Sequence, residues 1–285
     1  MNFPNGFPNP IVDGHLHLVN LDRFEYYWMK PEFAVLQRNF FAEDVRQVYE
    51  ANNIGQAVLV QAHPSRAETE YLVEVANTYS FIGGIIAHVD LRSERIEQDL
   101  AELSEYRIIR GVRHQQAEDR GEDWFLGVGV MRGLKAVSDA GLIYDLLVKP
   151  QHLPSILKVM EKLPDLRMVL EHMGKPPIRS GAIEPWAGDL SAFARNPSVQ
   201  CKISELVTQA HWKKWSSEDF KPYVQHALKC FSPDRLMWGS GWPVCLLAAD
   251  FERTLSSAVE ALGPLSKAEL DRVFRQTARS CYGID

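Results

Sequence analysis

Short β-rich apolar runs alternate with amphipathic stretches along the 285 residues of this chain. This order is typical of parallel βα units, in which a helix follows each strand and covers the sheet. The apolar runs predict strands at 11–18, 56–63, 81–91, 108–114, 142–148, 167–172, 199–204 and 236–239. Apolar residues at helical spacing predict helices at 42–51, 68–79, 94–103, 130–140, 154–162, 185–194, 219–230 and 250–262. Eight such units predict an α/β fold, a (β/α)8 TIM barrel in a single domain over 1–285, with a C-terminal extra helix at 267–280.

The alternative with the same alternation is a doubly wound open sheet. That fold carries a GxGxxG fingerprint after its first strand, and this chain has none there. The pair Gly127 and Gly129 follows a loop instead. The barrel is therefore the favoured architecture.

Composition excludes several classes of protein. A formal net charge of -6 argues against a nucleic-acid surface, which carries a basic excess. Gly83, Gly84 and His88 interrupt one of the longest apolar runs, which is far shorter than the ~20 residues of a membrane span. The first six residues have neither a basic start nor an apolar segment, so we expect a cytoplasmic protein without a secretory signal. The four cysteines show no CxxC spacing, which predicts reduced thiols.

Polar side chains stand at the ends of most predicted strands. Two of them, His15 and His17, are at i and i+2, so on a strand they share one face. The others are Gln61, His63, His88, Asp90, Arg113, His114, Glu171, His172, Lys202 and Ser204. Strand ends of a barrel meet at one mouth, where such residues are catalytic. One or two buried histidines could be ordinary core residues, but six of nine at strand ends favour a shared site.

Two predicted connections are unusually long, 19–40 and 115–129, and both carry aromatic residues. The first contains Trp28, and the second contains Trp124 and Phe125. Long aromatic connections are often functional, so we expect them to roof the pocket, the alternative being that they pack against neighbouring loops.

Five segments together resemble a known family. They are VDGHLHL at 12–18, GVRH at 111–114, VLEHMGKP at 169–176, CKIS at 201–204 and MWGSGWPV at 237–244. In this order they are similar to the "amidohydrolase 2" branch of the amidohydrolase superfamily, and most of all to its lactone hydrolases, which act on sugar lactones or pyrone dicarboxylates. The resemblance extends over the whole chain.

The resemblance implies roles for individual residues. His15, His17 and His172 would surround the lactone carbonyl, directly or as ligands of a divalent metal; zinc is the expected metal, although some members of the family use none. Arg113 and His114 would hold substrate oxygens. Gln61, Lys202 and Trp242 are further candidates for the substrate pocket, although Lys202 fits a paired lysine inside the barrel equally well. These roles suit ester hydrolysis, in which an oxyanion develops beside donors already in place.

This chain departs from the family pattern at Gly241. Family members usually carry aspartate there, as the group that accepts a proton from the attacking water, and glycine cannot do so. The rest of 237–244 is intact, which favours an inactivated variant; the other explanation is a natural protein that uses another group or has lost hydrolysis. Asp250, on the next helix, and Glu171, expected on the opposite side of the strand from His172, are poor replacements. Glu171 itself stands where many relatives have aspartate and is expected to orient a neighbour.

The sequence therefore predicts a hydrolase that opens a small lactone, a sugar-acid ester or another polar cyclic ester. The rivals are a decarboxylase of the same superfamily and a non-catalytic barrel that binds a ligand. A small molecule is the expected partner, and the sequence leaves a homo-oligomer open.

Overall fold

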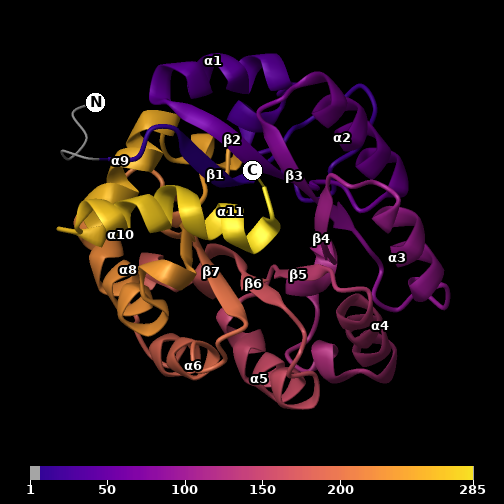
Figure 1. The fold of residues 1–285 in the computed structure, drawn as a ribbon. Coiled ribbons are helices and arrows are strands. Elements are labelled where there is room, and N and C mark those ends of the chain that lie inside the picture. The colour runs from indigo at the N-terminus through magenta and orange to yellow at the C-terminus, as the bar shows by residue number, and fades with distance from the viewer. Residues whose placement is uncertain (1–6, 285) are drawn as a thin grey trace.

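Eight parallel strands form one sheet whose spatial order follows the chain from β1 to β8 (Figure 1). The computed structural model describes residues 7–284, so the six residues on which the expectation about a secretory signal rests lie outside it. The strands are β1 (Ile11–Leu16), β2 (Ile54–Val60), β3 (Ile82–His88), β4 (Ile109–Arg113), β5 (Ile143–Leu146), β6 (Met168–Leu170), β7 (Val199–Ile203) and β8 (Leu236–Trp238). The predicted TIM barrel is confirmed.

The barrel closes between β1 and β8, just beyond the end of β8. Leu16 pairs with Trp242 in a parallel bridge, and the Gly241 N–H donates to the His15 carbonyl at 2.9 Å. Gly239 permits this approach, since a Cβ there would lie 2.6 Å from the His15 Cβ. The seam therefore fixes the backbone of the predicted histidine pair.

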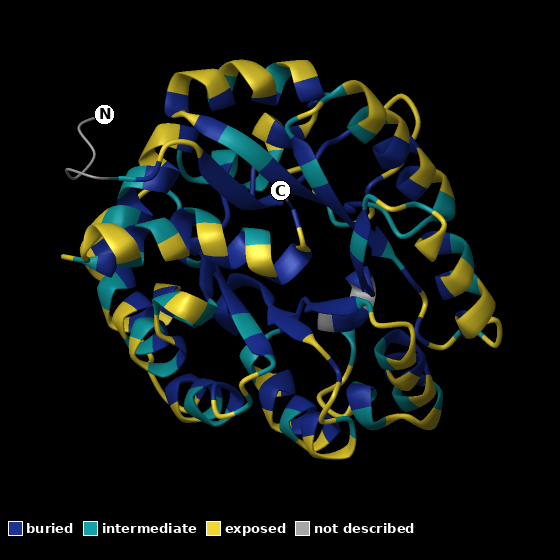
Figure 2. Cartoon of the chain, in the orientation of Figure 1, coloured by how far each residue is buried: buried dark blue, intermediate teal, exposed yellow. Residues whose placement is uncertain are grey.

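Helices surround the strands, with their buried faces turned inward and their exposed faces outward (Figure 2). They are α1 (Ala42–Asn52), α2 (Arg66–Thr78), α3 (Ile96–Ser104), α4 (Val128–Asp139), α5 (Leu153–Lys162), α6 (Trp186–Phe193), α7 (Leu206–Gln209), α8 (Ser217–Phe231) and α9 (Phe251–Leu262). In α9 the residues Phe251, Leu255, Ala258 and Leu262 are buried, and this helical spacing gives one apolar face. The Arg253 N–H donates to the Asp250 carboxylate at 2.7 Å and caps this helix.

The C-terminal segment crosses one end of the barrel (Figure 1). It consists of α10 (Lys267–Asp271), a π-helical turn at Arg272–Gln276 and α11 (Thr277–Tyr282), where a single helix was expected. Arg167, which precedes β6, donates to the Cys281 carbonyl, and Ile284 lies beside Gly83 at the start of β3. This segment therefore covers the N-terminal ends of the strands, and the opposite end is left for the mouth.

Most predicted strands extend too far at their carboxyl ends. The prediction places 11–18 and 167–172 in strands, whereas β1 ends at Leu16 and β6 at Leu170. The reason is visible after β6, where His172 and Met173 both have φ 53° and the chain leaves the sheet. The sequence pattern of apolar and polar residues continues beyond that point, so it does not show where the strand ends.

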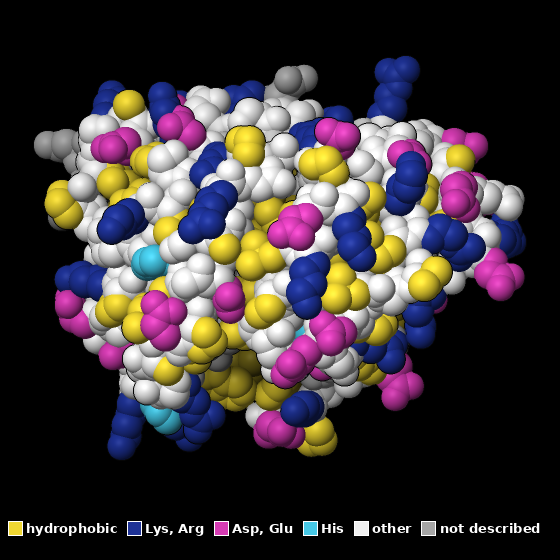
Figure 3. Space-filling model, turned by 90° about the horizontal axis from the view of Figure 1, so that it is seen from below, with side chains coloured by type: hydrophobic (Ala, Val, Ile, Leu, Met, Phe, Trp, Pro, Cys, Tyr) yellow, Lys and Arg dark blue, Asp and Glu magenta, His cyan; other side chains and the backbone are white. Residues whose placement is uncertain are grey.

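The surface carries no large block of one charge on the side shown in Figure 3, where Lys and Arg are interspersed with Asp and Glu. Within residues 7–284, no helix is long and apolar enough to span a bilayer. All four cysteines are free thiols, as expected.

Candidate active site

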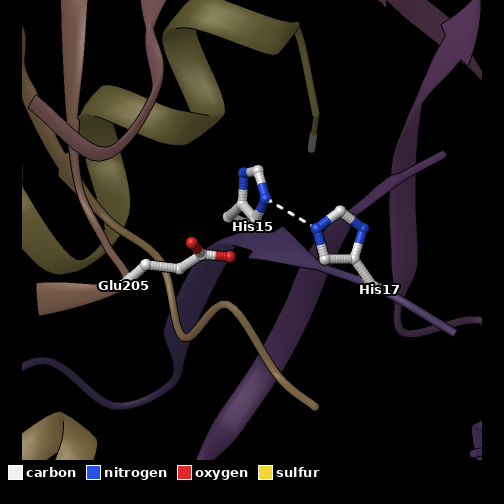
Figure 4. Close-up of side chains that lie close together, drawn as sticks. All are labelled: His15, His17 and Glu205. Atoms are coloured by element: carbon white, nitrogen blue, oxygen red, sulfur yellow. Dashed lines mark hydrogen bonds between the residues drawn. The ribbon is translucent and has the colours of Figure 1, made fainter. Parts of the chain in front are cut away.

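A pair of buried histidines from β1 forms the centre of the site. His15 and His17 point to the same side of the strand, and their Nε2 atoms are 2.9 Å apart (Figure 4). His17 Nδ1 lies 2.8 Å from the Val60 carbonyl at the end of β2. The i and i+2 spacing thus brings the two rings together, as the sequence predicts.

The neighbours of the pair assign its protons. The Val60 carbonyl can only accept, so His17 carries its proton on Nδ1 and its Nε2 is an acceptor. His15 must then donate from Nε2, and its Nδ1 accepts from the Lys202 ammonium at 3.3 Å. Burial lowers the pKa of His17 to about 3, and the pKa of His15 falls well below its usual value for the same reason, with Lys202 adding to the effect. Both imidazoles are therefore neutral at neutral pH.

His172 completes the cluster from the turn after β6. Its ring centroid is 4.6 Å from that of His15, and its Nδ1 is 2.8 Å from the Ser204 hydroxyl after β7. The expectation that Glu171 faces away from His172 is wrong, because its carboxylate lies 3.9 Å from His172 Nε2. The alternation of side chains along a strand does not apply there, since β6 ends at Leu170 and the backbone of His172 is in the left-handed region.

Four buried charges lie beside the cluster inside the barrel. Glu171 accepts from Arg113 Nη1 at 2.7 Å and lies 3.8 Å from Lys202 Nζ. Lys202 in turn donates to Asp145 at 2.6 Å. Burial by itself would raise the pKa of Glu171, but Arg113 and Lys202 lower it to about 2. The carboxylate therefore stays ionised and holds the two cations, which fits the orienting role predicted for it.

A second carboxylate, Glu205, reaches the histidines from the loop after β7. Its Oε2 is 3.7 Å from His172 Nε2, and Figure 4 shows its carboxylate turned toward His15 and His17. Its side chain is only 10% exposed. Sequence reasoning missed this residue, although it directly follows the strand-seven motif that ends at Ser204.

Gly241 lies next to Glu205. It has φ +64°, and a Cβ added to it would be 2.6 Å from the Glu205 Cγ. The Glu205 side chain therefore occupies the space that a side chain at position 241 would enter.

A cavity of about 410 Å³ opens above the cluster. Its lining includes His17, Arg113, His172 and Glu205, together with Trp28 and Phe33 from the long connection after β1. Gln115 and Asp119 contribute from the connection after β4. The first connection thus roofs the pocket with aromatic residues, as expected. In the second, Trp124 packs against His114 with ring centroids 4.8 Å apart and planes tilted by 41°, and Phe125 is fully buried.

The remaining predicted site residues are buried outside this lining. Lys202 is held by Asp145, which favours the paired-lysine interpretation. His114 packs beside His88 and its Nδ1 faces the Val89 carbonyl at 3.1 Å. Trp242 packs edge-on against Phe40. Gln61 is fully buried, and neither polar atom of its amide has a hydrogen-bond partner within the described residues.

The residues present fit a zinc ion. Within the described chain there are two groups of three residues whose donor atoms all lie within 4.8 Å of one another. One group is His15, His17 and Glu205, and the other is His15, Glu171 and His172. Neither group contains all three histidines, and the set His15, His17 and His172 stays a prediction. Tetrahedral zinc places ligand atoms about 3.3 Å apart, so the His15 and His17 nitrogens need only a small opening. His15 would then carry its proton on Nδ1. Glu171 Oε1, a buried atom with no hydrogen-bond partner among residues 7–284, lies 3.4 Å from this nitrogen.

Comparison with known proteins gives consistent matches. A family model described as amidohydrolase matches residues 12–284. The chain is 33% identical to L-fucono-1,5-lactonase of Burkholderia ambifaria and 31% identical to that of Burkholderia multivorans, covering 96% of each chain in both cases. A solved amidohydrolase from Burkholderia multivorans with bound zinc has a TM-score of 0.89 at 30% identity, covering 96% of this chain and 99% of that one.

Proposed function

Because this chain belongs to the amidohydrolase family, we propose that it hydrolyses a small lactone, with L-fucono-1,5-lactone as the first candidate substrate. The observation that carries the proposal is the match to two L-fucono-1,5-lactonases along almost their full length. The cavity supports it, since its volume lies within the usual range for small-molecule sites.

The chemistry of the cluster suits attack of water on an ester carbonyl. The neutral imidazoles of His17 and His172 line the cavity and can donate to or accept from substrate oxygens. The Arg113 guanidinium lines it as well and carries a permanent positive charge beside the developing oxyanion. Its orientation is fixed by Glu171 and by the Gln61 carbonyl at 2.5 Å.

A divalent metal, zinc first, is part of the proposal. His15, His17 and one carboxylate oxygen of Glu205 would hold it, since Glu171 is already engaged by Arg113 and Lys202. A bound zinc ion supplies a Lewis acid that polarises the carbonyl and lowers the pKa of water.

The glycine at position 241 has two possible effects on the rate of lactone hydrolysis, and experiment distinguishes them. If its missing side chain disables the site, hydrolysis by the chain as it stands is lost, and Gly241→Asp raises it by roughly 10²- to 10⁴-fold. If another carboxylate serves instead, the chain is active and Gly241→Asp brings no gain.

The test is turnover of a lactone panel that contains L-fucono-1,5-lactone, other sugar lactones and 2-pyrone-4,6-dicarboxylate. Proton release is followed with time, and the mass of the product is measured by mass spectrometry. We expect a product heavier than the substrate by one water, from the wild-type chain or from a position-241 variant. A product lighter by carbon dioxide indicates a decarboxylase instead. Tight binding of an unchanged lactone by every variant indicates a binding protein.

A further inference from the structure

We propose that Glu205 is the catalytic carboxylate of this site and accepts the proton of the attacking water in place of a side chain at position 241. The proposal rests on the lactone hydrolysis proposed above. It assigns to the loop after β7 a role that sequence reasoning placed after β8.

The first argument is elimination among carboxylates. Two residues of the described cavity lining carry one, Asp119 and Glu205. Asp119 lies at the exposed rim, with 53% of its side chain accessible, and pairs with Lys149 at 3.4 Å. Glu205 is buried against the imidazoles of His15, His17 and His172. Glu171 lies beside His15 and His172 inside the barrel, but it is outside the lining and is bound by Arg113.

The second argument is steric. A Cβ at position 241 would lie 2.6 Å from the Glu205 Cγ and 3.4 Å from its Oε1. Real Cβ atoms do not approach another carbon so closely, so the present Glu205 conformation requires glycine at 241. The pair explains why glycine stands in an otherwise intact segment, since glycine leaves room for a carboxylate from the loop after β7.

The third argument is backbone conformation. Glu205 has φ 52° and ψ 27°, in the left-handed region that residues with a Cβ rarely adopt. The Thr208 N–H and hydroxyl hold this turn by donating to the Glu205 carbonyl at 3.2 and 2.8 Å. Such backbone outliers concentrate at functional sites, where the surrounding structure maintains them. Here the outlier aims the carboxylate at the histidines.

The proposed step is balanced in atoms and charge. The water oxygen bonds to the lactone carbonyl carbon while one water proton passes to the second carboxylate oxygen of Glu205, the one that would not hold the metal. The tetrahedral intermediate then breaks the ring C–O bond, and the leaving alkoxide takes that proton. The product is the open hydroxy acid, and Glu205 returns to its ionised form.

The first experiment compares Glu205→Gln with Glu97→Gln on the lactone that the wild type turns over best. Glu97 lies exposed on α3, so its variant makes the same chemical change away from the site. We expect kcat of Glu205→Gln to fall by about 10²- to 10⁴-fold with a smaller change in KM, and Glu97→Gln to match the wild type. Circular dichroism and thermal unfolding establish that both are folded.

The second experiment exchanges the two positions. Gly241→Asp alone should lower activity, because its side chain collides with Glu205. Glu205→Gly should be inactive, and Glu205→Gly combined with Gly241→Asp should regain most of the lost activity. Formate added to Glu205→Gly should restore part of kcat by entering the vacated space. A merely structural role for Glu205 predicts no rescue by formate.

The outcomes separate this proposal from the function on which it rests. Full activity of Glu205→Gln overturns the role of Glu205 and leaves lactone hydrolysis standing. An inert wild type with an active double variant also overturns it, because Gly241 then disables the site. If the wild type and the double variant are both inert toward every lactone, the proposed function fails and the proton-transfer step fails with it.

Discussion

Lys202 is a fully buried cation whose stability depends on its partners. Its ammonium donates to Asp145 at 2.6 Å and faces His15 Nδ1 at 3.3 Å. Desolvation makes such a buried charge costly unless partners compensate it. Burial raises the pKa of Asp145, while Lys202 acts in the opposite direction. The lysine therefore contacts His15 from inside the barrel and does not line the cavity.

This arrangement makes Lys202→Met strongly destabilising. The substitution keeps most of the side-chain volume but leaves Asp145 buried without its cation, which costs about 3–5 kcal/mol. Urea unfolding measures the loss. Lys135→Met is the matched control, because Lys135 forms an exposed pair with Asp139 worth at most ~1 kcal/mol. Equal losses in the two variants would contradict the buried ion pair.

Single residues also mark where sequence reasoning reaches its limit. The HxH spacing was sufficient to predict that His15 and His17 share a face, because strand alternation fixes it. Glu171 and Glu205 could not be placed in the same way. The positions of both carboxylates depend on left-handed turns at His172 and Glu205. A histidine or a glutamate in the sequence does not indicate a positive φ, as a glycine would.

Among the elements, β1 and the segment after β8 close the barrel, and the histidine pair lies at this seam. Asp13 in β1 is fully buried and accepts from the Ser240 N–H at 2.8 Å and from the Tyr49 hydroxyl at 2.8 Å. Together with the Leu16 and Trp242 bridge, these bonds hold the two strand ends in register. The number and order of the strands were predictable from the alternation of apolar runs, but the seam contacts involve residues far apart in sequence and have no local signal.

The seam predicts the effect of Gly239→Ala. The added methyl would lie 2.6 Å from the His15 Cβ and 2.9 Å from its N, so the backbone of β1 must move. Overpacking of this kind costs about 1–3 kcal/mol, and displacement of His15 should lower kcat as well. Thermal unfolding and lactone turnover measure the two effects.

Gly121→Ala is the control for this prediction, since nothing lies within 4 Å of a Cβ at that position. It should leave stability and turnover near the wild-type values. A Gly239→Ala variant that behaves like this control would show that the seam is looser than the structure indicates.

At the scale of the whole molecule, the two ends of the barrel have separate tasks. The carboxyl ends of the strands carry the histidines and the cavity, and the other end is covered by α11 (Figure 1). The sequence predicted a final helix packed on the barrel, but its apolar pattern does not say which end it covers. The structure answers this through Tyr282, whose hydroxyl enters the barrel and donates to both Asp145 oxygens at 2.9 and 3.0 Å.

Tyr282→Phe tests this division of tasks. It removes a hydrogen bond to a charged group in the interior, so we expect unfolding free energy to fall by about 1.5–3 kcal/mol. Tyr223→Phe removes a bond to the neutral Ala182 carbonyl at 2.9 Å and should cost less. Because Lys202 still holds Asp145, turnover by the folded Tyr282→Phe protein should equal that of the wild type. A loss of turnover without a loss of stability would mean that the helix at the closed end acts on the site through Asp145, Lys202 and His15, and that the two ends are not independent.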